Sequence, residues 1–171
     1  MHGLTESSQI REIPDHQEVY LDRDGFTSIT IDILERVDHP ATDEEALTYH
    51  LLDITDETDQ LCIASTNPAE LSKHLVPAYS LIASTSPTPN TDGGSDLTII
   101  MLLLMRLEMQ NTDVLVAVNI PYRGKQFTSG VVDLSPNLAS GMVDDNFELG
   151  WDILKAIEQS FEIQDWGLFG E

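Results

Sequence analysis

The chain has 171 residues, enough for one domain with a buried core, and 41% of them are hydrophobic, which argues against global disorder. It carries 30 acidic and 8 basic residues, for a net charge of −22. This charge argues against nucleic acid and anionic membranes as partners, because binding either one requires lysine and arginine. It favours a basic protein surface reached by electrostatic steering, although acidity can also serve solubility alone.

The acidic residues are concentrated toward the two ends: 16 lie in residues 1–60, 6 in 61–141 and 8 in 142–171. Cys62 is the only cysteine, so an internal disulfide is impossible and a reducing compartment is expected. The N-terminal residues form no apolar signal core, and the longest apolar run, Leu97 to Met105, is too short to span a membrane. We expect one domain over residues 1–171 that does not insert into a membrane.

The first third of the chain predicts two strands, Glu18 to Asp22 and Phe26 to Glu35, joined by a tight turn at Asp22 to Gly25. The turn also suggests a calcium loop. That alternative is disfavoured, because Tyr20 and Ile31 occupy the positions where an EF-hand loop needs acidic ligands.

The second strand alternates, with Ile29, Ile31 and Ile33 expected on one face and polar residues on the other. Leu34 interrupts this alternation, so we expect a bulge or the end of the strand there. A bulge would bring Asp32 and Glu35 onto one surface.

A helix is predicted from a cap at Thr42, with Glu45 completing a capping box, to about Ile54. Its expected buried stripe is Leu47, Leu51 and Ile54. A short strand at Leu61 to Ser65, a helix at Pro68 to Leu75 capped by Asn67, and a strand at Ala78 to Thr85 follow.

The proline- and glycine-rich stretch Ser86 to Ser95 is predicted to be a surface loop. Asp96 to Met109 and Thr112 to Pro121 predict an antiparallel hairpin turning at Gln110 and Asn111. Within it, Ile99 to Met105 is apolar at consecutive positions, which indicates a central strand covered by helices on both faces of the sheet.

The last third predicts a loop region at Arg123 to Ser140, with a short strand at Gly130 to Leu134. Phe147 to Phe161 has apolar residues at helical spacing, and Asp144, Asp145 and Asn146 supply its N-terminal cap. Ile163 to Phe169 is expected to add a final strand.

No constellation for catalysis or metal binding is recognisable. The sequence lacks nucleophile-elbow, Walker and dinucleotide motifs, and its five histidines have no metal-ligand spacing. Cys62 lies in an apolar strand and is expected to be a core residue, while His50 is expected to be a hydrogen-bonded structural histidine. We therefore predict no enzyme activity of its own, no cofactor and no metal.

Five short segments resemble, in the same order, motifs of the Mog-type Ran-binding proteins, also called Ran guanine nucleotide release factors. Arg11 to Tyr20 resembles the R-x-[V/I]-P-D-x-Q-E-V-[Y/F] signature of this family. The other four segments are Ser28 to Glu35, Tyr49 to Asp53, Thr112 to Pro121 and Asp165 to Gly170.

The resemblance implies an α/β/α sandwich of the PsbP-like type: a central, mostly antiparallel sheet of about six strands with helices on both faces. It also implies a protein that binds the GTPase Ran and promotes release of its guanine nucleotide, in support of nuclear transport. A monomer found in nucleus and cytoplasm is expected. On this hypothesis the partner-binding residues are Asp15, Gln17, Glu18, Asp32 and Glu35, with Arg11 orienting them.

Other interpretations remain open at this stage. Asp15 also suits a turn that it stabilises through its own backbone, and Asp32 and Glu35 suit a solvated sheet face. Family members usually begin with an apolar strand containing G-G-A, whereas Met1 to Glu6 stands here, so we expect that first strand to be missing. A non-catalytic adaptor on the same fold, for example one that escorts a membrane protein, is the alternative function, and a hydrolase or lyase with an unrecognised site is a third.

Overall fold

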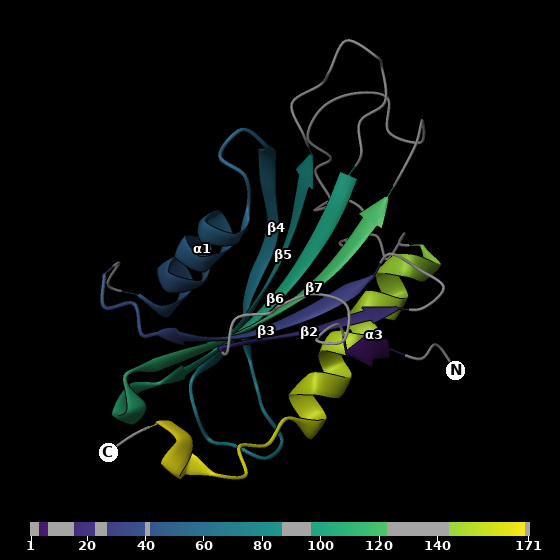
Figure 1. The fold of residues 1–171 in the computed structure, drawn as a ribbon. Coiled ribbons are helices and arrows are strands. Elements are labelled where there is room, and N and C mark those ends of the chain that lie inside the picture. The colour runs from purple at the N-terminus through teal and green to yellow at the C-terminus, as the bar shows by residue number, and fades with distance from the viewer. Residues whose placement is uncertain are drawn as a thin grey trace.

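The computed structural model describes residues 4–6, 16–22, 27–39, 42–86, 97–122 and 144–169. In these residues an antiparallel sheet of seven strands has the order β1-β2-β3-β7-β6-β5-β4. One long helix lies on each face of the sheet (Figure 1). The expected antiparallel sheet between helices is confirmed, with one strand more than the six expected.

The strands are β1 (Leu4–Glu6), β2 (Gln17–Asp22), β3 (Ser28–Glu35), β4 (Gln60–Ala69), β5 (Ala78–Ser86), β6 (Leu97–Leu107) and β7 (Thr112–Tyr122). The helices are α1 (Asp43–Ile54) and α3 (Asp145–Ser160), with short 3-10 helices η2 (Glu108–Gln110) and η3 (Trp166–Phe169). The three-residue strand β1 pairs with β2 at one edge of the sheet. The expectation that the first strand of the family is missing stays a prediction.

Strand β6 separates two cores, as its unbroken apolar sequence predicts. Met101, Leu103 and Met105 face the layer that contains Phe147 and Leu154 of α3. The residues between them in sequence face the layer that contains α1, which buries Ala46, Leu47 and Leu51 there. The β6–β7 hairpin turns where expected, through η2 and Asn111, which adopts a left-handed conformation with φ 49°.

Helix α1 begins as predicted. The Thr42 side chain accepts from the Glu45 N–H at 3.2 Å, and the Glu45 carboxylate accepts from the Thr42 N–H, so both halves of the capping box are present. Its buried stripe ends earlier than expected: Ile54 is 41% exposed, and His50 takes part in the buried face instead.

The predicted helix at Pro68 to Leu75 is wrong. Strand β4 continues to Ala69, and Asn67 and Pro68 pair with Ser80 and Tyr79 of β5. The Asn-Pro pair has the sequence of a helix start, but β4 is the edge strand, where proline is tolerated because no neighbour needs its missing N–H. Sheet pairing therefore prevails over the local helix signal.

Strand β3 contains no bulge at Leu34; of the two expected alternatives, the end of the strand is the one that forms, one residue later at Glu35. Its pairing with β7 is continuous from Ser28 opposite Asn119 to Glu35 opposite Thr112. Leu34 keeps the alternation and packs toward the α1 side of the sheet. Ile33, on the other face, is 47% exposed, so the apolar pair Ile33 and Leu34 reflects neither a buried face nor a break in the pairing of the strand.

Helix α3 also forms as predicted. Asp144 caps it by accepting from the Phe147 N–H at 2.9 Å, and the same carboxylate accepts from the Tyr122 hydroxyl at 2.7 Å. Burial, followed by the hydrogen bond and charge of Asp144, raises the pKa of Tyr122. The strand expected at Ile163 to Phe169 is wrong, because residues 166–169 form η3 and only Phe169 of that turn packs on the core.

Several predictions fall outside the described residues. These are most of the turn at Asp22 to Gly25, the loop expected from Ser86 onward, and the loop region with its short strand between Arg123 and Ser140.

Substituting Gly150 tests how closely α3 packs on β7. A Cβ atom there would overlap with the Ile120 Cδ1 atom and lie 3.1 Å from Cγ1. Alanine normally stabilises a helix interior over glycine by about 1 kcal/mol. We expect Gly150→Ala instead to lower the free energy of unfolding by about 1–3 kcal/mol through overpacking, as measured by urea denaturation. An increase in stability would show that the two elements pack less tightly.

Candidate functional site

Two of the predicted binding residues meet where β2 begins. Gln17 and Asp32 are direct partners across the β2–β3 pair, and the Gln17 amide donates to Asp32 Oδ1 at 2.7 Å. Asp32 is only 7% exposed, so Gln17 both covers its carboxylate and fixes its orientation. Because residues of β3 alternate between faces, Asp32 and Leu34 lie on the side of the sheet covered by α1.

Glu18 lies on the other face of the same pair of strands. Its carboxylate is exposed and accepts from the Tyr20 hydroxyl at 2.8 Å. Glu35, the last residue of β3, is three residues from Asp32 in a strand with no bulge between them. The predicted bulge that would bring Asp32 and Glu35 onto one face is therefore absent.

The structure thus gathers four of the six predicted residues at one end of the β2–β3 pair, divided between the two faces of the sheet. Gln17 and Asp32 lie on one face and Glu18 on the other, while Glu35 stands at the end of β3, where it lines a pocket beside α1. We call these four residues the acidic margin. Arg11 and Asp15 lie outside the described residues.

A buried ionic network lies beside the margin, centred on Asp113 of β7. Its carboxylate has no exposed surface. Oδ2 lies 2.9 Å from His50 Nε2 and accepts from the Val37 N–H at 3.1 Å, while Oδ1 accepts from Arg106 Nε at 3.0 Å. His50 was expected to be a hydrogen-bonded structural histidine, which these contacts confirm.

Arg106 extends the network toward the start of α1. It is 4% exposed, and its guanidinium donates to Asp43 Oδ1 at 2.7 Å and to the Val37 carbonyl. One arginine therefore connects β6, β7, the first turn of α1 and the segment after β3. Sequence reasoning missed it because Arg106 is an isolated basic residue at the end of an apolar strand, and nothing local shows which carboxylates surround it.

Burial tends to raise the pKa of the Asp113 carboxyl. Hydrogen bonds from His50 and from the Val37 N–H, together with the charge of Arg106, outweigh burial and hold that pKa below its ordinary value. Asp113 is therefore ionised at neutral pH. Because the folded-state pKa is lowered, the stability it contributes is present above its unfolded pKa of about 3.9 and is lost as pH falls through the folded value.

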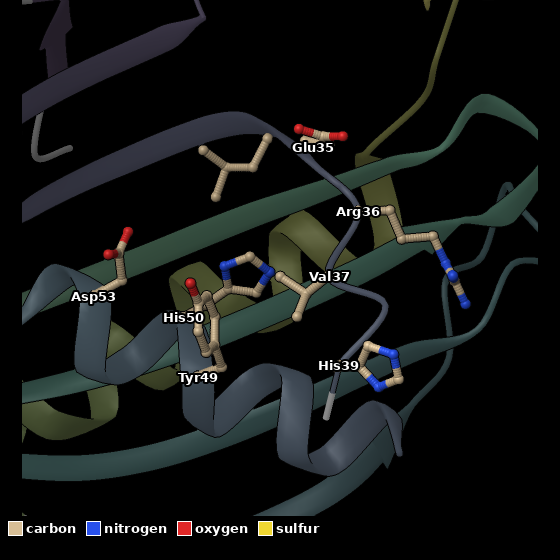
Figure 2. A pocket seen from close by; sticks show the side chains of 8 residues that line it. Glu35, Arg36, Val37, His39, Tyr49, His50 and Asp53 are labelled. Atoms are coloured by element: carbon tan, nitrogen blue, oxygen red, sulfur yellow. The ribbon is translucent and has the colours of Figure 1, made fainter. Parts of the chain in front are cut away.

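A pocket of about 330 Å³ opens next to this network, between the end of β3 and α1 (Figure 2). Leu34, Glu35 and Val37 line one side, and Tyr49, His50 and Asp53 line the other. The pocket therefore joins two of the sequence motifs, the β3 motif that ends at Glu35 and the Tyr49-His50-x-x-Asp53 motif. Sequence reasoning recognised this motif but did not assign Tyr49 or Asp53 to the site, although the three-residue spacing of Asp53 from His50 on a helix was the available signal for Asp53.

The residues that the structure describes contain neither a recognisable metal site nor a membrane-spanning helix. No group of three or more histidine, cysteine or acidic residues among them is arranged to hold a metal ion. Neither described long helix has the length and apolar composition needed to cross a membrane.

We expect Asp113→Asn to destabilise the fold. The substitution removes the fully buried counter-charge of Arg106 and leaves it with Asp43 at the edge of the network, and breaking a buried ion pair in this way typically costs about 3–5 kcal/mol. Urea unfolding at pH 7 should show this loss, whereas Asp152→Asn, an exposed position on α3, should leave the stability nearly unchanged. Equal stabilities of the two variants would contradict a stabilising role for the network.

Wild type and Asp113→Asn together test how the stability contributed by Asp113 depends on pH. Between pH 7 and pH 3 the wild type should lose more stability than Asp113→Asn, because only the wild type carries the carboxylate with a lowered folded-state pKa. Urea unfolding midpoints measured for both proteins across this pH range test this expectation. If the stabilities of the two proteins fall in parallel with pH, the expectation is wrong.

Comparisons with solved structures agree with this architecture. A structure of a single-residue mutant of protein Mog1 matches with a TM-score of 0.69 at 21% identity, over 98% of this chain and 90% of that one. The Saccharomyces cerevisiae Ran-binding protein Mog1p matches with a TM-score of 0.62 at 22% identity, over 90% of this chain and 82% of that one. At such identities the likeness establishes the fold alone.

Sequence comparisons establish the family. A Dictyostelium discoideum protein named probable ran guanine nucleotide release factor is 26% identical over 174 residues, which cover 93% of this chain and 84% of that protein. The Saccharomyces cerevisiae nuclear import protein MOG1 is 30% identical over 134 residues, which cover 70% of this chain and 59% of that protein. The family model described as Ran-interacting Mog1 protein matches residues 2–121. The chain therefore belongs to the family of Ran-interacting Mog1 proteins.

Proposed function

We propose that this protein binds the small GTPase Ran, promotes release of its bound guanine nucleotide and thereby supports protein transport between nucleus and cytoplasm. Membership of the Ran-interacting Mog1 family carries the proposal. The Dictyostelium relative is named a release factor, which supports the proposed nucleotide release. The yeast relative is named a nuclear import protein, which supports the proposed role in transport. The net charge of −22 supports a basic partner surface.

The contact surface that we propose is the acidic margin. Glu18, on one face of the sheet, and Glu35, at the end of β3, are both exposed and accessible to basic groups of a partner. On the other face Gln17 holds one oxygen of Asp32, and Oδ2 has no hydrogen-bond partner among the residues that the structure describes. The partner would therefore enclose the end of the β2–β3 pair rather than rest on one flat face. Arg11 and Asp15 precede this end in sequence and belong to the same proposal.

Nucleotide release needs no covalent step by this protein. A GTPase holds its nucleotide through backbone amides of the phosphate-binding loop, a lysine and Mg²⁺. A partner that binds the nucleotide-free or Mg²⁺-free state more tightly weakens nucleotide binding by the same factor, because the coupling is reciprocal. Each tenfold change in affinity corresponds to about 1.4 kcal/mol, so a few charge-assisted contacts are sufficient. We propose that the protein acts in this way as a monomer, in both nucleus and cytoplasm.

The test is release of a fluorescently labelled guanine nucleotide from Ran. Wild-type protein at saturating concentration should accelerate release. The double variant Asp32→Asn/Glu35→Gln should reduce that acceleration by about tenfold or more, because it removes both charges while keeping side-chain size.

Asp152→Asn/Glu148→Gln is the matched control, since it makes the same chemical changes at exposed positions of α3. It should behave as wild type. Unchanged nucleotide release with wild-type protein would refute the proposed function. Equal effects of the two double variants would refute the role of the margin and leave the function in place.

A further inference from the structure

The second ring nitrogen of His50 is the starting observation. His50 is 3% exposed, and its Nε2 atom lies 2.9 Å from the ionised Asp113 carboxylate. In the neutral imidazole the Nε2 proton is donated to that carboxylate, so Nδ1 carries a lone pair. Among the described residues Nδ1 has no hydrogen-bond partner. The Nδ1 acceptor of this buried histidine is therefore held in a fixed orientation on the wall of a pocket.

The pocket around this nitrogen is lined by two carboxylates, those of Glu35 and Asp53, by the Tyr49 ring and by apolar residues, with Arg36 and His39 at its other end. Figure 2 shows the His50 ring between Asp53 on one side and Val37 on the other, with Tyr49 next to it. Tyr49 packs edge-on against His50, with ring centroids 5.8 Å apart and planes at 79°. Asp53 is an exposed carboxylate one helical turn from His50, on the same side of α1.

The lining favours a cation over an anion. The permanently charged cation of the lining, Arg36, is paired through Nη1 with Asp38 at 2.6 Å, and although its buried Nε has no partner among the described residues, its side chain points away from His50 (Figure 2). A carboxylate, a ring nitrogen with a free lone pair and a tyrosine face together suit a group that has several N–H donors and a positive charge. Lysine and arginine side chains are the protein groups with this chemistry.

We propose that this pocket binds a lysine or arginine side chain of the docked GTPase, an inference that rests on the function proposed above. Asp53 supplies the counter-charge, His50 Nδ1 accepts one N–H, and Tyr49 covers the side chain from the outer side. The pocket begins where the acidic margin ends, because Glu35 closes β3 and lines the pocket. Docking on the margin would therefore bring a neighbouring basic residue of the partner to the pocket entrance.

The experiment compares Ran affinity for three proteins: wild type, Asp53→Asn and Asp152→Asn. The two variants have equal net charge, and both change an exposed aspartate on a helix, but on opposite faces of the sheet. Calorimetric titration should give a dissociation constant about tenfold weaker for Asp53→Asn, the loss expected for one charge-assisted hydrogen bond. Asp152→Asn should stay within about twofold of wild type, because distant exposed charges are screened.

A second measurement tests directly whether His50 Nδ1 accepts a hydrogen bond from the partner. With ¹⁵N-labelled histidine, the Nδ1 resonance of His50 should shift when wild-type protein binds Ran, as a free lone pair begins to accept a hydrogen bond. The shift should be smaller with Asp53→Asn.

The outcomes separate the two proposals. If wild-type protein does not bind Ran, the proposed function fails and the pocket inference fails with it. If wild type binds but Asp53→Asn and Asp152→Asn have equal affinities, or the His50 resonance is unmoved, only the pocket inference is overturned.

Discussion

Burial of a single carboxylate, that of Asp113, constrains more of this structure than any other interaction. A charge without exposed surface is tolerated only when hydrogen bonds and counter-charges replace water. Here those groups come from three separate segments: His50 from α1, Arg106 from β6 and the Val37 N–H from the chain after β3. Each segment has to lie where it can reach the same two oxygens. The position of α1 on the sheet is therefore set by directional contacts as well as by apolar packing.

This constraint also shapes the surface near the acidic margin. Val37 is held to Asp113 through its N–H and to Arg106 through its carbonyl, so the chain leaves β3 along a fixed path. That path forms one wall of the pocket, and α1 forms the other. A surface whose walls are fixed before binding loses less conformational entropy on association, so weak charge contacts can contribute more fully to affinity.

The sequence patterns predicted the parts of the fold in which one local signal dominates. The apolar run in β6, the capping box of α1 and the spacing in α3 each specified an element that forms. Prediction failed where pairing decides the outcome, as at Pro68, which an edge strand accommodates, and at Leu34, which continues β3 without a bulge.

The pocket could not be predicted from the sequence for a related reason. Its chemistry depends on which nitrogen of His50 meets Asp113, two residues 63 positions apart. The motifs that contain these residues were recognised. The contact between His50 and Asp113, however, forms only in the tertiary structure, and no spacing along the chain predicts it.

Asp113 positions α1 on the sheet through its contacts with His50 and Arg106. Native-state hydrogen exchange of the α1 and α3 amides, compared between wild type and Asp113→Asn under strongly native conditions, tests it most directly. We predict that the α1 amides exchange faster in the variant while those of α3, on the opposite face, keep their protection. An equal change in both helices, or none in α1, would contradict the claim.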